Sequence, residues 1–307
     1  MARLTPPRGP GGVRFAVLGS GRMAATMRAL VGDVRQDEAD AVYIATRNAD
    51  HAAQSIAAME AGRPVLCEKP FALDPRSAAE VIAVSKRTRL LYMEAVATPF
   101  LPAVEAALRL AGEGVPGGAP HLRASFGYRV SRSSHPRLFG PGGGVLADRA
   151  VYPLMLALIA LGPARLADAT VERDADGVDV AARLLLDHGA GGRSDLAVSL
   201  VERLDNALSI EGAAGGLFVA PPLLAARRLS RRRPWLPARL RQQGLVRRAG
   251  DIAARAGPGW HPYGASPYLP EVAHFCGLLR DGANESPVVS HDRMLAVARL
   301  VDEARTA

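Results

Sequence analysis

The residues best suited to chemistry in this chain include a glutamate, a lysine and a proline at the end of an apolar run. Glu68, Lys69 and Pro70 follow RPVLC, at the expected carboxyl end of a buried strand. Open α/β sheets bind their ligands at that end, and a neighbouring carboxylate and proline can position an amine without hydrating it fully. Taken alone, the stretch also fits a solvated lysine at a strand end.

The chain has two lysines, Lys69 and Lys86, among 38 basic residues. The amine of lysine can lose its proton near neutrality, whereas the guanidinium of arginine stays charged. In a chain that otherwise uses arginine, a lysine is therefore a candidate for a position whose function requires an amine that can lose its proton.

A second stretch, GPGGGVLADRAVYPLML, is a glycine-rich loop that leads into an apolar helix. Asp148 and Tyr152 are four residues apart, a spacing that puts both side chains on one face of a helix. That face can point into a cleft between two domains. The alternative is local: Asp148 pairs with Arg149, and Tyr152 is an ordinary core tyrosine.

Gly19, Gly21 and Ala24 form the pattern G-x-G-x-x-A between a strand-like run and a helical run. Small residues there let the backbone turn tightly and approach a pyrophosphate at the N-terminus of the helix. The pattern is weak by itself, and a plain strand-to-helix turn is the alternative.

Strands alternate with helices over residues 13–97, which predicts a parallel, doubly wound α/β sheet of the Rossmann type. The expected strands are VRFAVLG, DAVYIAT, RPVLCEK and RLLYMEAV, and the expected helices are RMAATMRALV, HAAQSIAAMEAG and DPRSAAEVIAVSKRT. Asp74 and Pro75 are the expected N-cap and first residue of the third helix.

Residues 98–307 are predicted to form a second domain of α+β type with a mainly antiparallel sheet. Its expected strands are HLRASFGYRV, ARLADATVERD, VDVAARLLLD, DLAVSLVER and NALSIEGAAGGLFV. Its expected helices are TPFLPAVEAALRLAGEG, PYLPEVAHFCGLLRDG and SHDRMLAVARLVDEAR, besides the apolar helix that carries Asp148.

The composition, 49% hydrophobic, is that of a globular protein, and no apolar run approaches the roughly 20 residues of a membrane span. Residues 1–12 lack an apolar signal core, so we expect a flexible leader on a cytoplasmic protein. The two cysteines and the lone histidines show no metal-ligand spacing, which indicates neither a disulfide framework nor a metal site.

The net charge of +8 comes from one segment. Residues 225–255 contain ten arginines and one acidic residue, a net charge of +9, so the rest of the chain is close to neutral. Such a segment can bind nucleic acid or an anionic membrane. A solvated insertion is the favoured interpretation, because few aromatic residues are interleaved with the arginines.

Five segments, taken together and in order, resemble the Gfo/Idh/MocA oxidoreductases. They are VLGSGRMA, the run from VYIATRN to CEKPFALD, LYMEAVATPFLPAV, LFGPGGGVLADRAVYPL and the C-terminal tail. The likeness is greatest to the trans-1,2-dihydrobenzene-1,2-diol and xylose dehydrogenase branch. It implies NAD or NADP as cofactor and a homo-oligomer formed through the C-terminal sheet. The implied reaction is hydride transfer between nicotinamide and a secondary alcohol or ketone of a small sugar, cyclitol or diol.

The resemblance also implies roles for individual residues. Lys69 is the expected catalytic lysine, Tyr152 its acid/base partner, and Asp148 orients the substrate. The residues implied for cofactor binding are Gly19, Gly21, Arg22, Met23, Thr46, Arg47, Asn48, His51, Glu68, Lys69 and Glu94. Arg22 and Arg47 slightly favour NADP over NAD.

The chain departs from the family directly after its first helix. Only 20 residues separate Gly21 from Val42, and GDVRQDEAD is too polar to be the strand that grips the adenosine ribose. A strand-helix-strand block is missing by comparison, which puts the first strand at the edge of the sheet. If its helix keeps its usual face, the first crossover is left-handed; otherwise the linker changes faces around the sheet, or a partner chain covers the edge. We therefore expect weakened or unusual cofactor binding.

Two further departures lie near the expected site. Arg47 stands where the family commonly has proline, and Arg149 and Ala150 replace an apolar residue and a glycine, a change expected to alter the substrate pocket. Two other functions stay open: a degenerate family member that binds a ligand or regulates, and a cofactor-free biosynthetic enzyme that uses Lys69 and Tyr152 as acid/base groups.

Overall fold

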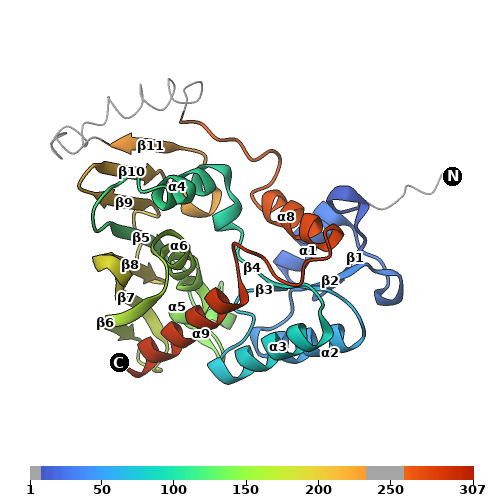
Figure 1. Cartoon of the computed structure of the whole chain (residues 1–307). Coiled ribbons are helices and arrows are strands. Elements are labelled where there is room, and N and C mark those ends of the chain that lie inside the picture. The colour runs from blue at the N-terminus through green and yellow to red at the C-terminus, as the bar shows by residue number, and fades with distance from the viewer. Residues whose placement is uncertain (1–7, 233–258) are drawn as a thin grey trace.

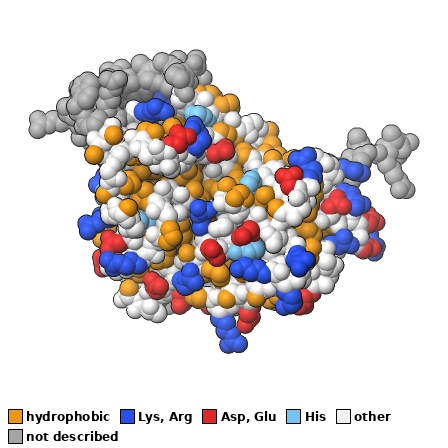
Figure 2. Space-filling view, viewed as in Figure 1, with side chains coloured by type: hydrophobic (Ala, Val, Ile, Leu, Met, Phe, Trp, Pro, Cys, Tyr) orange, Lys and Arg blue, Asp and Glu red, His pale blue; other side chains and the backbone are white. Residues whose placement is uncertain are grey.

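The computed structural model describes residues 8–232 and 259–307. Most of the arginine-rich segment 225–255 lies outside these residues, and so does the binding role considered for it. On the face shown in Figure 2, basic and acidic side chains are interspersed. None of the helices in the described part of the chain has the length and apolarity needed to cross a membrane.

Two sheets organise the described chain (Figure 1). The first is parallel, in the order β1-β2-β3-β4, with strands Phe15–Leu18, Ala41–Ile44, Val65–Glu68 and Tyr92–Ala95. Its helices are α1 (Arg22–Val31), α2 (His51–Glu60) and α3 (Pro75–Thr88). The predicted Rossmann-type alternation is therefore confirmed.

The short strands of this sheet form because their residues are apolar and find cover on both faces. Every residue of β2 and β4 is buried, as parallel strands between two layers of helices require. Helix α3 begins as predicted: Asp74 Oδ1 accepts a hydrogen bond from Ser77 N at 2.9 Å, and Pro75 follows at the first helical position.

The second sheet has the order β11-β10-β9-β5-β8-β7-β6. Its strands are β5 (His121–Gly127), β6 (Ala164–Arg173), β7 (Asp179–His188), β8 (Arg193–Ser199), β9 (Leu208–Gly212), β10 (Gly215–Val219) and β11 (Leu229–Arg232). Helices α4 (Pro102–Gly112), α5 (Val145–Arg149) and α6 (Val151–Leu161) pack against it. The predicted α+β second part is confirmed.

One detail refines the prediction of a mainly antiparallel sheet, and two differ from what was predicted. Strands β5 and β8 are parallel neighbours, so the second sheet is mixed, although most of its pairs are antiparallel. NALSIEGAAGGLFV forms two paired strands, β9 and β10, because its central glycines and alanines turn the chain. The apolar helix is divided at Ala150, so Asp148 lies in the last turn of one helix and Tyr152 in the first turn of the next.

The first strand lies at the edge of its sheet, as predicted, and the linker after α1 covers that edge. Val34 N donates to Phe15 O at 2.9 Å, and Val17 N donates to Asp33 Oδ1 at 2.9 Å. Arg28 Nη2 donates to Val17 O at 2.8 Å. The polar linker thus forms no strand, yet it satisfies the backbone groups that a neighbouring strand would otherwise bond.

Helix α1 lies on the face of the first sheet that also carries α8 (Leu269–Arg280), whereas α2 and α3 lie on the opposite face (Figure 1). Since the four strands are parallel and follow in order, the first crossover has the opposite hand to the next two. Crossovers are right-handed in about 98% of cases. The first crossover therefore has the rare hand, which is the outcome expected from the missing block if α1 keeps its usual face.

The C-terminal helices return to the first sheet. Phe275 of α8 places its ring 6.0 Å from that of Phe15, and His291 Nε2, at the start of α9 (His291–Thr306), lies 3.2 Å from Tyr92 O. Residues 10–12, expected in the flexible leader, form a short 3-10 helix that contacts α8. The tail assigned to the second domain therefore packs on both parts: α9 contacts α3 of the first and α6 and β6 of the second.

Candidate active site

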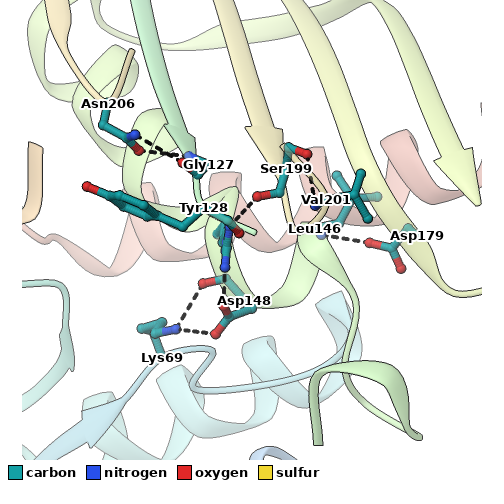
Figure 3. A network of polar contacts seen from close by, with 10 residues as sticks. Lys69, Gly127, Tyr128, Leu146, Asp148, Asp179, Ser199, Val201 and Asn206 are labelled. Atoms are coloured by element: carbon teal, nitrogen blue, oxygen red, sulfur yellow. Dashed lines mark hydrogen bonds and ion pairs between the residues drawn. The ribbon is translucent and has the colours of Figure 1, made fainter. Parts of the chain in front are cut away.

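The predicted catalytic lysine meets the predicted aspartate between the two sheets (Figure 3). Lys69 follows β3, and its side chain is 14% exposed. Its Nζ donates to Asp148 Oδ1 at 2.7 Å and to Asp148 O at 2.9 Å. The two residues are 79 positions apart, so the fold, and not the local sequence, makes this contact.

Helix α5 is fixed so that its last turn presents Asp148. Gly144 has φ +92, and a Cβ there would lie 2.0 Å from Asp179 Oδ1. Leu146 N donates to Asp179 Oδ2 at 2.7 Å. A carboxylate from β7 therefore binds the N-terminus of α5, and glycine is required for that close approach.

Tyr152 completes this group from the first turn of α6. Lys69 Nζ lies 5.3 Å from the centroid of its ring, and the ring of Phe126 stacks edge-on at 5.3 Å. Among the described residues, the phenol oxygen of Tyr152 has no hydrogen-bond partner. The ring is held while the hydroxyl stays free for a ligand.

The charges of the three residues depend on one another. Burial acts to lower the pKa of Lys69, but Asp148, Tyr152 and Glu68 together outweigh it and the pKa is raised. Burial acts to raise the pKa of Asp148, yet Lys69 and then Arg149 hold it below its ordinary value. Burial raises the pKa of Tyr152. Near neutral pH the site therefore holds an ammonium, a carboxylate and a neutral phenol.

Three carboxyl groups lie near this centre: those of Glu94 and Glu271 are buried, and that of Glu68 is half-buried. Glu68 accepts a hydrogen bond from the hydroxyl of Tyr43, and Glu94 Oε1 accepts one from Phe71 N at 3.0 Å. Glu271 of α8 is 2% exposed, and burial raises its pKa well above the ordinary value. Burial also raises the pKa of Glu68, and that of Glu94 to about 7.

Glu271 was not among the residues predicted from the sequence. Its signal is present in PYLPEVAHF, where one acid interrupts an apolar helical run. Its Oε1 is buried without a hydrogen-bond partner in the described structure. An unpaired acid of this kind is a candidate functional group.

The glycine turn connects β1 to α1 as predicted. Gly19 has φ +115, and a Cβ there would lie 2.2 Å from Ala45 O, so glycine is required for packing against the next strand. Gly21 is the N-cap of α1, and Arg22 and Met23 form its first turn. Ala24 is fully buried, as the third small residue of such a motif should be.

The residues after β2 make mostly local contacts. Thr46 Oγ1 donates to Gln54 Oε1 at 2.7 Å, and Arg47 pairs with Asp50 at 2.9 Å. His51 is buried, with Nδ1 2.8 Å from Pro70 O. Asn48 is the exception, because its Nδ2 donates at 3.1 Å to Gly142 O in the glycine-rich loop.

A hollow of about 650 Å³ lies on the α2 side of β1 and β2. Gly19 and Thr46 line it, and so do Gln36, Gln54, Ala57, Ala58, Ala61 and Arg63, among others. Helix α1 lies on the other face of the sheet, which leaves this face open beside α2. No strand of the described chain stands beyond β1 to hold an adenosine ribose.

The described residues contain no group of three or more histidine, cysteine, aspartate or glutamate side chains arranged to hold a metal ion. Cys67 and Cys276 are free and buried. His274 Nε2 lies 2.8 Å from Ser286 Oγ, and the pKa values of His274 and His291 are lowered by burial. These histidines make structural contacts.

Arg149, expected to alter the substrate pocket, is buried instead. Its side chain is tied to Tyr128 O and Ser199 O at the ends of two strands. Its Nε also lies 3.6 Å from Asp148 Oδ2. Asp148 therefore binds Lys69 between the two sheets and also makes the local contact with Arg149 that the sequence offered as the alternative.

Comparison with known proteins agrees with this fold. Residues 25–96 match the Gfo/Idh/MocA oxidoreductase family, NAD-binding Rossmann fold. The trans-1,2-dihydrobenzene-1,2-diol dehydrogenase of Bos taurus is 26% identical over 276 residues, 89% of this chain and 78% of the relative. That of Homo sapiens is 26% identical over 270 residues, 87% and 77% of the two chains.

Solved structures share the fold over nearly the whole chain. A 3-ketoreductase from Actinomadura kijaniata in complex with NADP and TDP-benzene has a TM-score of 0.75 and 22% identity, covering 95% of this chain and 89% of the other. An aldose-aldose oxidoreductase from Caulobacter crescentus has a TM-score of 0.72 and 19% identity, with 95% and 89% covered. Residues 25–96 are thus similar to the NAD-binding Rossmann domain of the Gfo/Idh/MocA oxidoreductases, the family that the motifs resemble.

Proposed function

We propose that the protein is an NAD(P)-dependent oxidoreductase that transfers a hydride between nicotinamide and a secondary alcohol or ketone of a small sugar, cyclitol or diol. The observation that carries this proposal is the shielded Lys69 ammonium, held by Asp148 beside the free phenol of Tyr152. The dehydrogenases named above act on a diol, and the solved relatives are a ketoreductase and an aldose oxidoreductase.

These residues fit the needs of the reaction. When a hydride reaches a carbonyl carbon, negative charge develops on the oxygen, and a nearby cation and a proton donor stabilise it. The bound cofactor supplies the hydride. Lys69 stabilises the charge, and Tyr152 donates its proton to the oxygen; in the reverse direction the alcohol proton returns to the phenolate.

The two ends of the cofactor fit the chain unequally. The glycine turn and the first turn of α1 suit the phosphates, and Lys69, Glu68 and Glu94 surround the place expected for the nicotinamide. Nothing in the described residues replaces the strand that usually grips the adenosine ribose. The residues present therefore favour a weakly held adenosine.

NADP is the cofactor we favour slightly over NAD. Arg47 is already paired with Asp50, which reduces its value for binding a phosphate. Arg22, the first residue of α1, is exposed and has no ion pair among the described residues. Its guanidinium is the group available for the extra phosphate of NADP.

The second sheet is the proposed interface of a homo-oligomer, as the resemblance implies. The face turned away from α4, α5 and α6 carries cross-strand ion pairs, including Arg183 with Asp195 and Arg123 with Glu211. Oppositely charged rows of this kind can pair with a second copy related by a twofold axis.

Titration of the purified protein with NADPH and NADH, followed by nicotinamide fluorescence, tests the proposal. We expect saturable binding, and turnover with at least one member of a panel of diols, aldoses and cyclitols. Lys69→Met should bind NADPH within a few-fold of the wild type and lose about 10²-fold or more in kcat. Lys86→Met, the matched change at the other lysine, should keep full turnover.

The absent adenosine strand favours a second candidate, a ligand-binding or regulatory protein that has lost the cofactor. Absence of binding at millimolar NADPH and NADH would support that candidate and contradict the oxidoreductase. Undiminished turnover in Lys69→Met would remove Lys69 from its role.

A further inference from the structure

Arg149 is only 4% exposed. It stands at a position where the family that the chain resembles has an apolar residue. It ends α5 directly after Asp148. A guanidinium is costly to bury unless its charge and its donors are matched. The contacts of Arg149 identify the groups that compensate its charge and accept its hydrogen bonds.

One end of the side chain is fixed to the second sheet. Arg149 Nη1 donates to Tyr128 O at 2.9 Å and also to Ser199 O. These carbonyls stand at the ends of β5 and β8, which are parallel neighbours in the sheet. The guanidinium carbon also lies 5.3 Å from the centroid of Phe126.

The other end of the guanidinium is turned toward the active site. Its Nε has no hydrogen-bond partner in the described structure and lies 3.6 Å from Asp148 Oδ2. The second oxygen of the same carboxylate holds Lys69 Nζ at 2.7 Å. The carboxylate of Asp148 therefore lies between two cations, one fixed to the sheet and one at the reacting centre.

A second path joins the same residues through rings. The ring centroid of Phe126 lies 5.3 Å from the guanidinium carbon of Arg149 and 5.3 Å from the ring centroid of Tyr152. The ring of Tyr152 in turn lies 5.3 Å from Lys69 Nζ. Arg149 is thus connected to both members of the proposed acid/base pair.

We propose that Arg149 is a positioning residue: fixed to the ends of β5 and β8, it keeps the Asp148 carboxylate ionised and turned toward Lys69. This inference rests on the proposed role of Lys69 in catalysis. It adds that the chain uses its own arginine, in place of the apolar residue of the family, to set the charge of that site.

Burial alone would raise the pKa of Asp148, and the cations Lys69 and Arg149 reverse that effect. The other titratable groups that face this centre are Glu68 and Tyr152. Without the charge of Arg149, Lys69 is the cation left to offset burial, so the pKa of Asp148 rises.

Because the chain has only two lysines, the pKa of Asp148 can be measured without cofactor or substrate. In a Lys86→Arg background, Lys69 is the single lysine, and a ¹³Cε label gives one NMR signal. Protonation of Asp148 changes that signal, so its acid transition reports the pKa of Asp148. The measurement stays valid even if the proposed reaction is wrong.

Two variants separate the charge of Arg149 from its hydrogen bonds. Arg149→Gln removes the charge and leaves two N–H donors, whereas Arg149→Lys keeps the charge with three donors in place of five. We expect the transition to rise by about one pH unit in Arg149→Gln and to stay near the wild-type position in Arg149→Lys. Arg183→Met, which removes an exposed arginine on β7, is the control and should leave it unchanged.

A purely structural role predicts a different pattern. Both variants would then lower the melting temperature in proportion to the donors lost, with Arg149→Gln the more affected, and the Lys69 signal would titrate as in the wild type. An unmoved transition in folded Arg149→Gln would overturn the proposal. If Arg149→Gln does not fold, a displaced transition in Arg149→Lys would overturn it equally.

Discussion

The chemistry assigned to Tyr152 depends on a phenol that is held by its ring and free at its oxygen. Tyr152→Phe keeps the stacking on Phe126 and the contact with Lys69, and removes only the hydroxyl. We expect kcat to fall by about 10²-fold, with the melting temperature unchanged because no intramolecular hydrogen bond is lost. Steady-state kinetics with the best substrate of the panel, together with thermal unfolding, checks this.

Equal losses of activity and stability in Tyr152→Phe would instead assign Tyr152 to the core. Phe126→Leu offers the comparison, because it disturbs the stacking without touching the hydroxyl. That change should lower stability more than Tyr152→Phe does.

Glu94 gives the protein a predictable dependence of stability on pH. Burial raises its pKa to about 7 from an ordinary value of 4.5. Between these two pH values the folded state holds a proton that the unfolded state releases, so the free energy of unfolding falls as the pH rises through this window. Above about pH 7 the effect levels off.

Glu94→Gln removes this titration because the amide is neutral at every pH. The variant should therefore gain about 2 kcal/mol relative to the wild type between pH 5 and pH 8, measured by denaturant unfolding at both values. Glu80→Gln, on the exposed side of α3, is the control. Parallel pH profiles for Glu94→Gln and the wild type would show that Glu94 is ionised in the folded protein.

Sequence motifs identified the central residues but not their surroundings. The spacing of Lys69 after its strand and of Asp148 after the glycine loop predicted two groups that the fold brings to 2.7 Å. The burial of Arg149 and Glu271 could not be predicted in this way. Their charge argues for the surface, and only the packing of α5 and α8 on the sheets overrides it.

At the scale of elements, the linker after α1 takes the place of a strand beside β1. Arg28 pairs with Asp33 at 2.6 Å, and both side chains also bond backbone atoms of β1. Asp33→Ala should lower the free energy of unfolding by about 1 to 2 kcal/mol, because Val17 N and Arg28 both lose a partner. Denaturant unfolding measures the difference.

The matched control for this prediction is a pair that contacts no strand edge. Arg76 and Glu80 pair at 3.2 Å, and the side chain of Arg76 is 91% exposed. Arg76→Ala should change stability by no more than about 0.5 kcal/mol. If Asp33→Ala is as mild as Arg76→Ala, the linker does not protect the edge of β1.

The alternation of strands and helices in the first sheet was predictable from apolar runs and caps, because those signals are local. The second sheet was predictable only as a set of strands. Its order, the parallel pairing of β5 with β8 and the turn between β9 and β10 depend on contacts between distant residues. The contacts by which the linker covers β1 could not be predicted either, because a polar stretch carries no local signal for them.

At the scale of the whole molecule, the missing block predicts how the cofactor is held. With no strand beyond β1, the adenosine half should add little to affinity. We expect reduced nicotinamide mononucleotide to bind within about tenfold of NADPH, a difference of about 1.4 kcal/mol. Fluorescence titrations with the two ligands give the ratio.

NADPH that binds about 10³-fold more tightly than the mononucleotide would contradict this expectation. It would show that the adenosine is gripped by residues other than those of the usual strand. The comparison is informative only if both ligands report on the same site, so Lys69→Met should alter the nicotinamide fluorescence of both in the same way.

Transfer of deuterium tests the central claim most directly. NADPH carrying deuterium at the reactive C4 position is incubated with the protein and a panel of ketoses, aldoses and ketones derived from cyclic diols, and the products are examined by mass spectrometry. The proposed reaction predicts one deuterium on the new CH–OH carbon of at least one product, with transfer lost in Lys69→Met. Bound NADPH that passes deuterium to no member of the panel would contradict hydride transfer to these substrates.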